Sequence, residues 1–272
     1  MNRLYRLLIH AVLAAGALLM ALPFLWMVLT SLKTFAESMQ APPTLIPAAW
    51  QFGNYAKVFE ETDFLRYFGN TLLLTVVKTA GQLLFCSMAA FAFATMRFPG
   101  RNALFLLLLS VMMLPHQISL IPTFLLVKEL HWLDTYYALT VPGLASAFGI
   151  FLLRQFFLSI PAELGEAARV DGASFPRIYA RVYLPLSAPG LLSLSIFVVM
   201  AAWNDFLNPL VMTSSDEMRT LSLAVASFVG EFSTDYPLMM AAACMAVLPL
   251  IVLFAALQRY FIQGIALTGM KS

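Results

Sequence analysis

Five polar or charged side chains lie inside otherwise apolar stretches of the sequence: Lys78, Gln82, Asn204, Asp205 and Asn208. Amides both donate and accept hydrogen bonds, which suits them to a hydroxyl-rich solute. Asn204 and Asn208 are four residues apart, a spacing that predicts a shared helical face. The same groups can instead hold helices together, as an ion pair between Lys78 and Asp205 would. The pattern therefore predicts either a path for a polar solute or internal contacts between helices.

The sequence has no recognisable catalytic or nucleotide-binding motif. It contains no G-x-x-x-x-G-K-[ST] run, so it does not bind ATP through a P-loop, and no H-E-x-x-H or G-x-S-x-G. Its histidines, His10, His116 and His131, are scattered, and Cys86 and Cys244 lie in apolar runs. We therefore expect this chain to be no enzyme and to hold no metal or cofactor, so that its work is conformational.

The composition indicates that a lipid bilayer surrounds most of the chain. Of its 272 residues, 61% are hydrophobic and 11% are charged, with a mean hydropathy of +0.84. A soluble domain is about a quarter charged. We therefore expect the bilayer, and not nucleic acid, to be a partner of this chain.

Six stretches are long and apolar enough to span a membrane as helices. They cover approximately residues 9–32, 70–95, 103–127, 136–158, 186–212 and 237–259. Each span needs about 20 apolar residues, because a helix rises about 1.5 Å per residue across a hydrocarbon core about 30 Å thick. Most loops between them are short. We predict an all-α polytopic membrane protein with six transmembrane helices, folded as a single transmembrane domain over residues 1–272.

The basic residues predict the orientation of these spans, since Lys and Arg concentrate on the cytoplasmic side of a membrane. With the N-terminus inside, most of them fall in cytoplasmic segments: Arg3, Arg6, Arg97, Arg101, Arg154, Arg169, Arg177, Arg181, Arg259 and Lys271. An even number of spans then places the C-terminus inside as well. We therefore expect both termini to be cytoplasmic.

The cytoplasmic loop 161–185, between the fourth and fifth predicted spans, has the signals of a helix–turn–helix. Pro161 suits the first position of a helix, and Gly172 suits its left-handed end. Pro176 suits the start of a second short helix, which we expect Pro185 to end just before the fifth span. The loop is too polar to enter the membrane and too structured to be a tether.

Three segments of this loop resemble the EAA motif of ABC importer permeases. They are Glu166-Ala167-Ala168, Asp171-Gly172-Ala173 and Val182-Tyr183-Leu184-Pro185. The spacing of the motif is kept throughout, and the one departure is Val182, where the motif has isoleucine. The C-terminal segment, Trp203-Asn204-Asp205-Phe206 and Leu133-Asp134-Thr135-Tyr136 are similar to carbohydrate-importer permeases. Over nearly its whole length the chain resembles the smaller, six-span permease of maltose-type importers.

This resemblance implies partners and contacts. The partners are a second homologous permease, an ABC ATPase dimer that binds ATP and Mg, and an extracytoplasmic binding protein that delivers a mono- or oligosaccharide. The location is a bacterial or archaeal cytoplasmic (inner) membrane. The implied ATPase contacts are Glu166, Ala167, Ala168, Asp171, Gly172, Ala173, Leu184 and Pro185, with Gly269, Met270 and Lys271 in the tail.

Two other interpretations remain open. An importer of the same class that carries glycerol phosphate or a polyol would share these features. A secondary transporter driven by protons or sodium would show inverted repeats and functional intramembrane acids. In this sequence only Asp205 is such an acid, and no repeat is evident.

Overall fold

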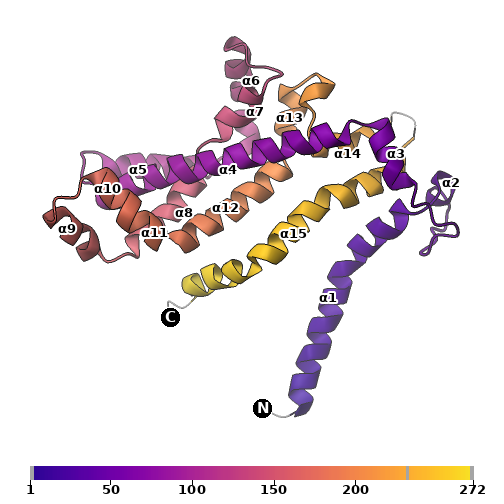
Figure 1. Ribbon diagram of the computed structural model, residues 1–272, viewed down its shortest axis with the longest axis horizontal. Helices are drawn as coiled ribbons and strands as arrows, with labels where there is room; N and C mark the ends of the chain where they lie inside the picture. Colours follow the sequence, from indigo (N-terminus) through magenta and orange to yellow (C-terminus); the bar gives the residue numbers. More distant parts are fainter. Residues whose placement is uncertain (1–2, 231–232, 270–272) are drawn as a thin grey trace. The chain divides into compact units, whose positions relative to one another are not determined.

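The computed structural model describes residues 3–230 and 233–269, and these residues fold into helices (Figure 1). The all-α prediction is therefore confirmed for the described residues. The chain divides into two compact units. Unit 1 takes in Met1–Leu65 and Leu223–Ile251, and unit 2 takes in Arg66–Ser222 and Val252–Ser272. The expectation of one transmembrane domain stays a prediction.

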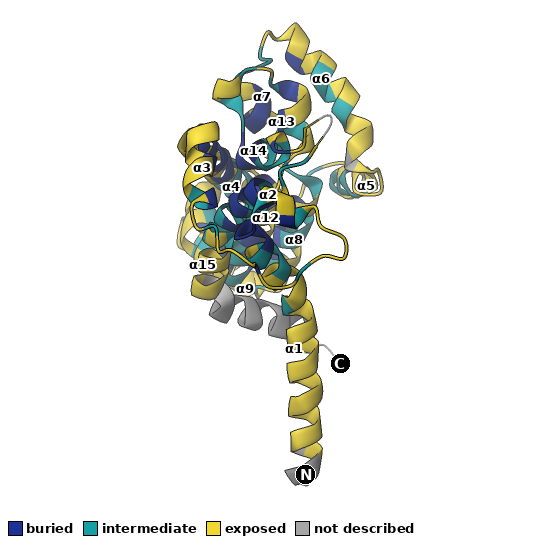
Figure 2. Cartoon of the chain, turned by 90° about the vertical axis from the view of Figure 1, so that its right-hand side faces the viewer, coloured by how far each residue is buried: buried dark blue, intermediate teal, exposed yellow. Residues whose placement is uncertain are grey.

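Unit 1 is built around two long apolar helices. It holds α1 (Arg3–Ser31), α2 (Phe35–Ser38), α3 (Asn54–Glu61), most of α14 (Leu221–Ser227) and the first part of α15 (Tyr236–Gly269). None of the most apolar part of α1 is buried within the chain, and Figure 2 shows this helix exposed along its length. A helix that is apolar all round and uncovered by its own chain must face lipid or another subunit.

Unit 2 holds the remaining helices and the larger core. Its elements are α4 (Phe64–Thr95), α5 (Arg101–Val111), η1 (His116–Ser119), α6 (Leu120–Glu129), α7 (Tyr136–Thr140), η2 (Val141–Gly143), α8 (Ala147–Leu158), α9 (Ala162–Val170), α10 (Phe175–Ile178), η3 (Tyr179–Tyr183), α11 (Leu184–Leu186), α12 (Ala188–Trp203), α13 (Leu207–Met212) and η4 (Asp216–Met218). Phe91 of α4, Leu153 and Phe157 of α8 and Leu194 of α12 meet in its core. The core thus joins α4, α8 and α12 into one body.

Four helical segments are long and apolar enough to cross a membrane: Leu7–Ser31, Phe64–Thr95, Tyr136–Leu158 and Tyr236–Ala256. A fifth candidate is the pair Phe175–Leu186 and Ala188–Trp203, which bends by 78° at its break. The described residues thus give four or five candidate spans, in agreement with a polytopic membrane protein.

The third predicted span, 103–127, is not one continuous helix. α5 ends at Val111, and the chain resumes as η1 and then α6. Pro115 explains the break, because it lacks a backbone N–H and disfavours helical backbone at the residue before it. Pro122 does not interrupt α6, since it lies in the first turn, where its missing donor has no partner to lose.

The prediction that Pro185 ends a helix just before the fifth span is wrong by two residues. The chain stays helical through Pro185, with a π-helical turn over Tyr179–Tyr183, and bends sharply at Ser187. Pro185 lies in the first turn of α11, and Pro189 lies in the first turn of α12. Proline is tolerated in a first turn, so the interruption falls between the two prolines.

The loop 161–185 forms a helix, a glycine turn and a second helix, as its sequence predicts. α9 ends in a Schellman motif, in which the Gly172 N–H donates to the Arg169 carbonyl at 3.0 Å and the Ala173 N–H to the Ala168 carbonyl at 2.9 Å. Gly172 has a φ of +81°, in the left-handed region that glycine adopts readily. The turn therefore depends on glycine at this position.

Candidate functional site

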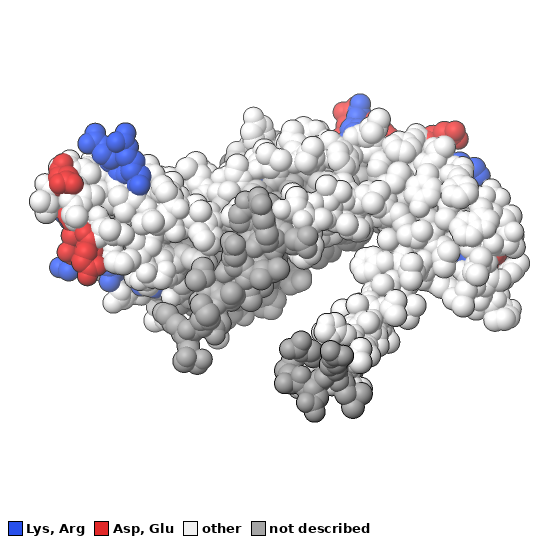
Figure 3. Space-filling view, turned by 60° about the horizontal axis from the view of Figure 1, so that its bottom comes forward, with Lys and Arg blue, Asp and Glu red and all other residues white. Residues whose placement is uncertain are grey.

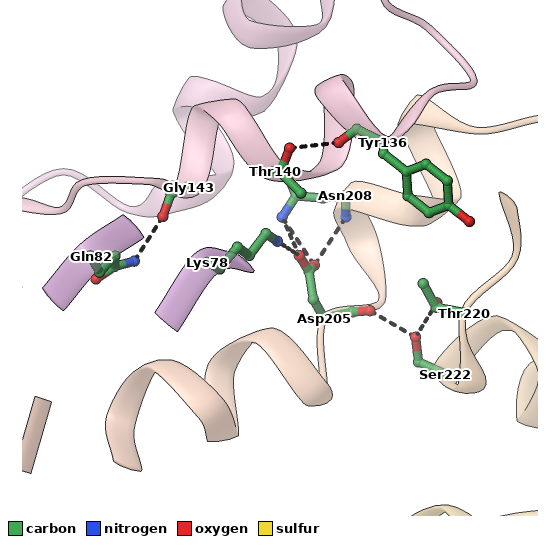
Figure 4. Close-up of polar contacts among 9 residues, drawn as sticks. All are labelled: Lys78, Gln82, Tyr136, Thr140, Gly143, Asp205, Asn208, Thr220 and Ser222. Atoms are coloured by element: carbon green, nitrogen blue, oxygen red, sulfur yellow. Dashed lines mark hydrogen bonds and ion pairs between the residues drawn. The ribbon is translucent and has the colours of Figure 1, made fainter. Parts of the chain in front are cut away.

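An ion pair between Lys78 and Asp205 lies at the centre of the polar site in unit 2 (Figure 4). Lys78 belongs to α4, and Asp205 lies in the break between α12 and α13. The Lys78 Nζ and the Asp205 Oδ2 are 3.0 Å apart, and the two side chains are 12% and 14% exposed. The pairing considered from the sequence is therefore present in the structure.

Asn208 and Ser222 complete the hydrogen bonding of Asp205. The Asn208 side-chain amide donates to both carboxylate oxygens, at 3.0 and 3.1 Å, and the Asn208 backbone N–H donates to Oδ1 at 3.3 Å. The Ser222 hydroxyl donates to the Asp205 carbonyl at 2.7 Å. A part-buried carboxylate with a cation and several donors keeps its charge at a reduced desolvation cost. These hydrogen bonds therefore stabilise the break between α12 and α13.

Gln82 lies one turn along α4 from Lys78 and binds the segment before α8. Its amide donates to the Gly143 carbonyl at 3.0 Å and accepts from the Ser146 hydroxyl at 2.8 Å. The same Ser146 oxygen caps α8 by accepting from the Gly149 N–H at 3.1 Å. A Cβ on Gly143 would lie only 3.2 Å from the Lys78 side chain, so glycine lets that side chain pass. The small residues Gly143 and Ser146 carry no sequence signal of this role.

These side chains border a cavity of about 580 Å³, which we call the pathway cavity. Lys78, Gln82, Asp205 and Asn208 line it, together with small residues such as Gly143, Ala145, Ser146, Ala201 and Ala202. Lys78 and Asp205 are the charged residues of the lining, and they compensate each other. The cavity therefore presents amides and hydroxyls around a neutral pair.

Asn204 does not line the pathway cavity, and the expectation that it shares a helical face with Asn208 is wrong. α12 ends at Trp203 and α13 begins at Leu207, so the two asparagines do not lie on one helix. The exposed Asn204 side chain donates to the Met200 carbonyl of its own helix at 2.8 Å. The spacing rule assumes an unbroken helix, and the break invalidates it here.

The residues of loop 161–185 divide between packed and exposed positions. Ala168 and Ala173 pack against the core of unit 2, and Leu184 is half-buried. The other predicted contact residues are exposed: Glu166, Ala167, Asp171, Gly172 and Pro185. The exposed set leaves α9 and its glycine turn accessible to another protein.

Two tyrosines that the sequence analysis did not select fix this loop to the helices of unit 2. The Tyr179 hydroxyl is 2.7 Å from the Ser87 hydroxyl of α4. The Tyr183 ring lies edge-on to Phe91 and Phe157, with centroids 5.1 and 5.7 Å apart. The loop is therefore packed directly onto α4 and α8.

The sequence matches a known protein family over most of this region. Residues 82–267 match the family described as the binding-protein-dependent transport system inner membrane component. The chain belongs to this family. Its members are multi-pass transport subunits of the inner membrane, without catalytic activity or a cofactor, and ATP is bound by a partner ATPase. No group of His, Cys, Asp and Glu among the described residues could hold a metal ion.

Full-length relatives of this permease are named for several solutes. It is 34% identical to the arabinooligosaccharides transport system permease protein of Halalkalibacterium halodurans, over 94% of this chain and 92% of that protein. It is 33% identical to the lactose transport system permease protein of Rhizobium radiobacter, over 97% and 96% of the two chains. It is 31% identical to the sn-glycerol-3-phosphate transport system permease protein of Brucella abortus, over 95% of each.

A solved structure shares the fold of the permease. This structure is a bacterial ABC transporter involved in the import of the acidic polysaccharide alginate, and the matched chain is 25% identical, with a TM-score of 0.83. The match covers 95% of this chain and 97% of that chain. The permease thus belongs to a family of binding-protein-dependent ABC importers whose members carry chemically different solutes.

Asp134 joins two loops of the permease at the other end of unit 2 from α9. Its carboxylate accepts from the Ser214 N–H at 3.0 Å, the Ser215 N–H at 3.1 Å and the Ser215 hydroxyl at 3.0 Å. Although the little burial it has raises its pKa, these hydrogen bonds lower the pKa of Asp134 below its ordinary value of 3.8. In the predicted tail, Gly269 is the last residue of α15, and Met270 and Lys271 lie outside the described residues.

Proposed function

We propose that this permease forms, with a second homologous permease, the membrane pathway for a mono- or oligosaccharide. An extracytoplasmic binding protein delivers the sugar, and an ABC ATPase dimer supplies the energy. In this proposal the chain crosses the membrane six times, with α5 and α6 together as the broken third passage, and both termini are cytoplasmic.

The proposal that the solute is a sugar rests on the neutral lining of the pathway cavity. Lys78 and Asp205 are 3.0 Å apart and cancel each other's charge. Asn208 and Gln82 supply amide groups, whose paired donors and acceptors suit hydroxyl-rich solutes. A glycerol phosphate carries a net negative charge and calls for an uncompensated cation. The relatives named for arabinooligosaccharides and lactose support the same choice.

The proposed coupling to the ATPase uses the exposed side of loop 161–185. Glu166 offers a charge-assisted hydrogen bond, and Ala167 and Gly172 allow a partner backbone to approach closely. Ala168, Ala173 and Leu184 hold the loop in place, and the helical segment that contains Pro185 leads to the bend at Ser187. The hydrogen bond between Tyr179 and Ser87 supports this assignment, since it joins the loop to α4, which also carries Lys78 and Gln82.

Co-purification tests the proposed assembly. The tagged chain is expressed with its native neighbouring genes, solubilised, and its bound chains are identified by mass spectrometry. We expect a second permease and an ATPase. The variant Glu166→Lys/Gly172→Asp should lose the ATPase and keep the second permease, while the control Lys128→Gln, at an exposed position of α6 outside this loop, should keep both. A wild-type chain that purifies stably on its own would instead point to ion-coupled transport.

A further inference from the structure

A second cavity of unit 2, about 850 Å³ in volume, lies between α9 and the ends of α4 and α8. Aromatic and aliphatic side chains form most of its wall: Phe91, Met96, Phe157, Ile160, Phe175 and Ile178. Its charged lining consists of Arg97, Arg101, Arg169 and Glu166, which is three cations against one anion. We call it the arginine cavity. Its apolar wall and cationic lining match an anion that also carries hydrocarbon.

One face of α9 closes this cavity. Ala162, Gly165, Glu166 and Arg169 all line it, and their spacing of three and four residues places them on one side of the helix. A Cβ on Gly165 would lie 3.1 Å from the Tyr183 hydroxyl, so glycine allows α9 to pack close against Tyr183. Val170, which follows Arg169 and does not line the cavity, is 88% exposed.

The arginines of the cavity keep most of their hydrogen-bond donors free. Arg101 donates from Nη1 to the Met96 carbonyl at 3.1 Å, which uses one of its five N–H groups. The Arg169 guanidinium lies 5.0 Å from the centre of the Phe175 ring. Arg97 makes no hydrogen bond or ion pair with the described part of the chain. Several charged donors therefore face a space in which the described residues supply one carboxylate.

The arginine cavity lies where a candidate membrane span ends. α4 qualifies as a span up to Thr95, and Arg97 lies two residues beyond that end. α5 then leads away from Arg101 with exposed apolar side chains, among them Leu104, Leu106 and Leu107. Figure 3 shows acidic and basic side chains gathered at the end of unit 2 that carries α9 and α10, beside uncharged surface. A phospholipid at this boundary would meet arginines at its headgroup and leucines along its chains.

We propose that the arginine cavity binds the phosphate headgroup of an anionic phospholipid, with Arg97 and Arg101 as its main contacts. Phosphate accepts charge-assisted hydrogen bonds from guanidinium groups, often two at a time. The apolar wall receives the glycerol backbone and the start of the acyl chains. Since α9 forms one wall, a bound lipid also fixes α9 against α4 and α8. The binding step is independent of the solute carried.

Native mass spectrometry of the full chain in detergent tests this site. The probes are phosphatidylglycerol and phosphatidylcholine with identical acyl chains, with inorganic phosphate as a competitor. We expect phosphatidylglycerol to bind more tightly than phosphatidylcholine and to resist millimolar phosphate. Each basic residue near an anionic lipid surface strengthens binding about fivefold, so Arg97→Gln/Arg101→Gln should bind phosphatidylglycerol about thirtyfold more weakly.

Two control variants separate the site from general charge and from misfolding. Arg177→Gln/Arg181→Gln removes the same charge from exposed positions outside the cavity, and it should bind like the wild type. Arg97→Lys/Arg101→Lys keeps the charge and should retain most of the affinity. Equal binding of the two lipids, equal loss in the Arg177/Arg181 variant, or displacement of the lipid by inorganic phosphate would each overturn the proposal.

Discussion

The two cavities of unit 2 differ in whether their charged side chains are paired with an opposite charge. In the pathway cavity, Lys78 is paired with Asp205 at 3.0 Å, and Asn208 adds further hydrogen bonds. In the arginine cavity, Arg97, Arg101 and Arg169 face a single carboxylate. Lys78 lies inside the candidate span Phe64–Thr95, where a charge is costly unless the chain compensates it, whereas Arg97 lies beyond the end of that span. Charges at the membrane boundary remain solvated, so they can stay unpaired until a ligand binds. The position along a span thus separates a structural charge from one available for binding.

Removing one member of the compensated pair should have the largest effect. Asp205→Leu leaves the Lys78 ammonium part-buried and unpaired, which we expect to destabilise the chain by about 3–5 kcal/mol. The double variant Lys78→Met/Asp205→Leu removes both charges and should recover most of that loss. Thermal unfolding of the purified variants in detergent measures both. Equal destabilisation of the single and double variants would show that the charges are not compensating each other.

A larger side chain at Gly165 should disturb the wall of the arginine cavity. Gly165→Leu places carbon atoms against the Tyr183 hydroxyl, and such overpacking costs about 1–3 kcal/mol. Gly69→Leu is the matched control, because a Cβ at that helical glycine meets nothing within 4 Å. We expect Gly165→Leu to lower the unfolding temperature and to weaken lipid binding, and Gly69→Leu to do neither. If Gly165→Leu leaves the unfolding temperature and lipid binding unchanged, α9 does not form a wall of the lipid-binding cavity.

Neutralising an arginine that has no partner should leave stability almost unchanged. Arg97→Gln removes no hydrogen bond of the described residues, so we expect a change within about 0.5 kcal/mol. The same unfolding assay compares it with Asp205→Leu. A loss for Arg97→Gln comparable with that for Asp205→Leu would mean that Arg97 has a structural partner, and the contrast between the cavities would disappear.

The smallest effect concerns pH and the loops joined by Asp134. Because the folded-state pKa of Asp134 is lowered, its hydrogen bonds contribute stability above the ordinary value of 3.8 and lose it as pH falls through the folded pKa. Asp134→Asn removes the charge, so the difference in unfolding temperature from the wild type should be constant at neutral pH and shrink below pH 3.8. A difference that shrinks already between pH 7 and pH 5 would contradict this assignment.

The sequence predicted local features well where short-range chemistry decides them. Gly172 ends α9 in the left-handed conformation, because few other residues adopt it readily. Lys78 and Asp205 pair, because an unpaired charge in apolar surroundings is costly. Pro115 explains the end of α5 in the structure, whereas the sequence analysis predicted one continuous span over 103–127.

Features built by long-range packing could not be read from the sequence. Ser87 and Tyr179 are 92 residues apart, and neither carries a motif that predicts their contact. Arg97 and Arg101 lie together just after α4, and Arg169 of α9 lines the same cavity only because the chain folds back. Asn204 was misplaced because an α-helical spacing was applied across a break, although Pro209, in the first turn of α13, signals an interruption just before that helix.

The most direct test of the account is the charge of the transported solute. The importer, reconstituted in proteoliposomes with its native partner permease, ATPase and binding protein, is assayed for ATPase stimulation by neutral oligosaccharides and by sn-glycerol 3-phosphate. The neutral pathway cavity predicts stimulation by a neutral sugar and none by glycerol phosphate. Stimulation by glycerol phosphate that neutral sugars do not match would contradict the assignment of the Lys78–Asp205 pair to a neutral path.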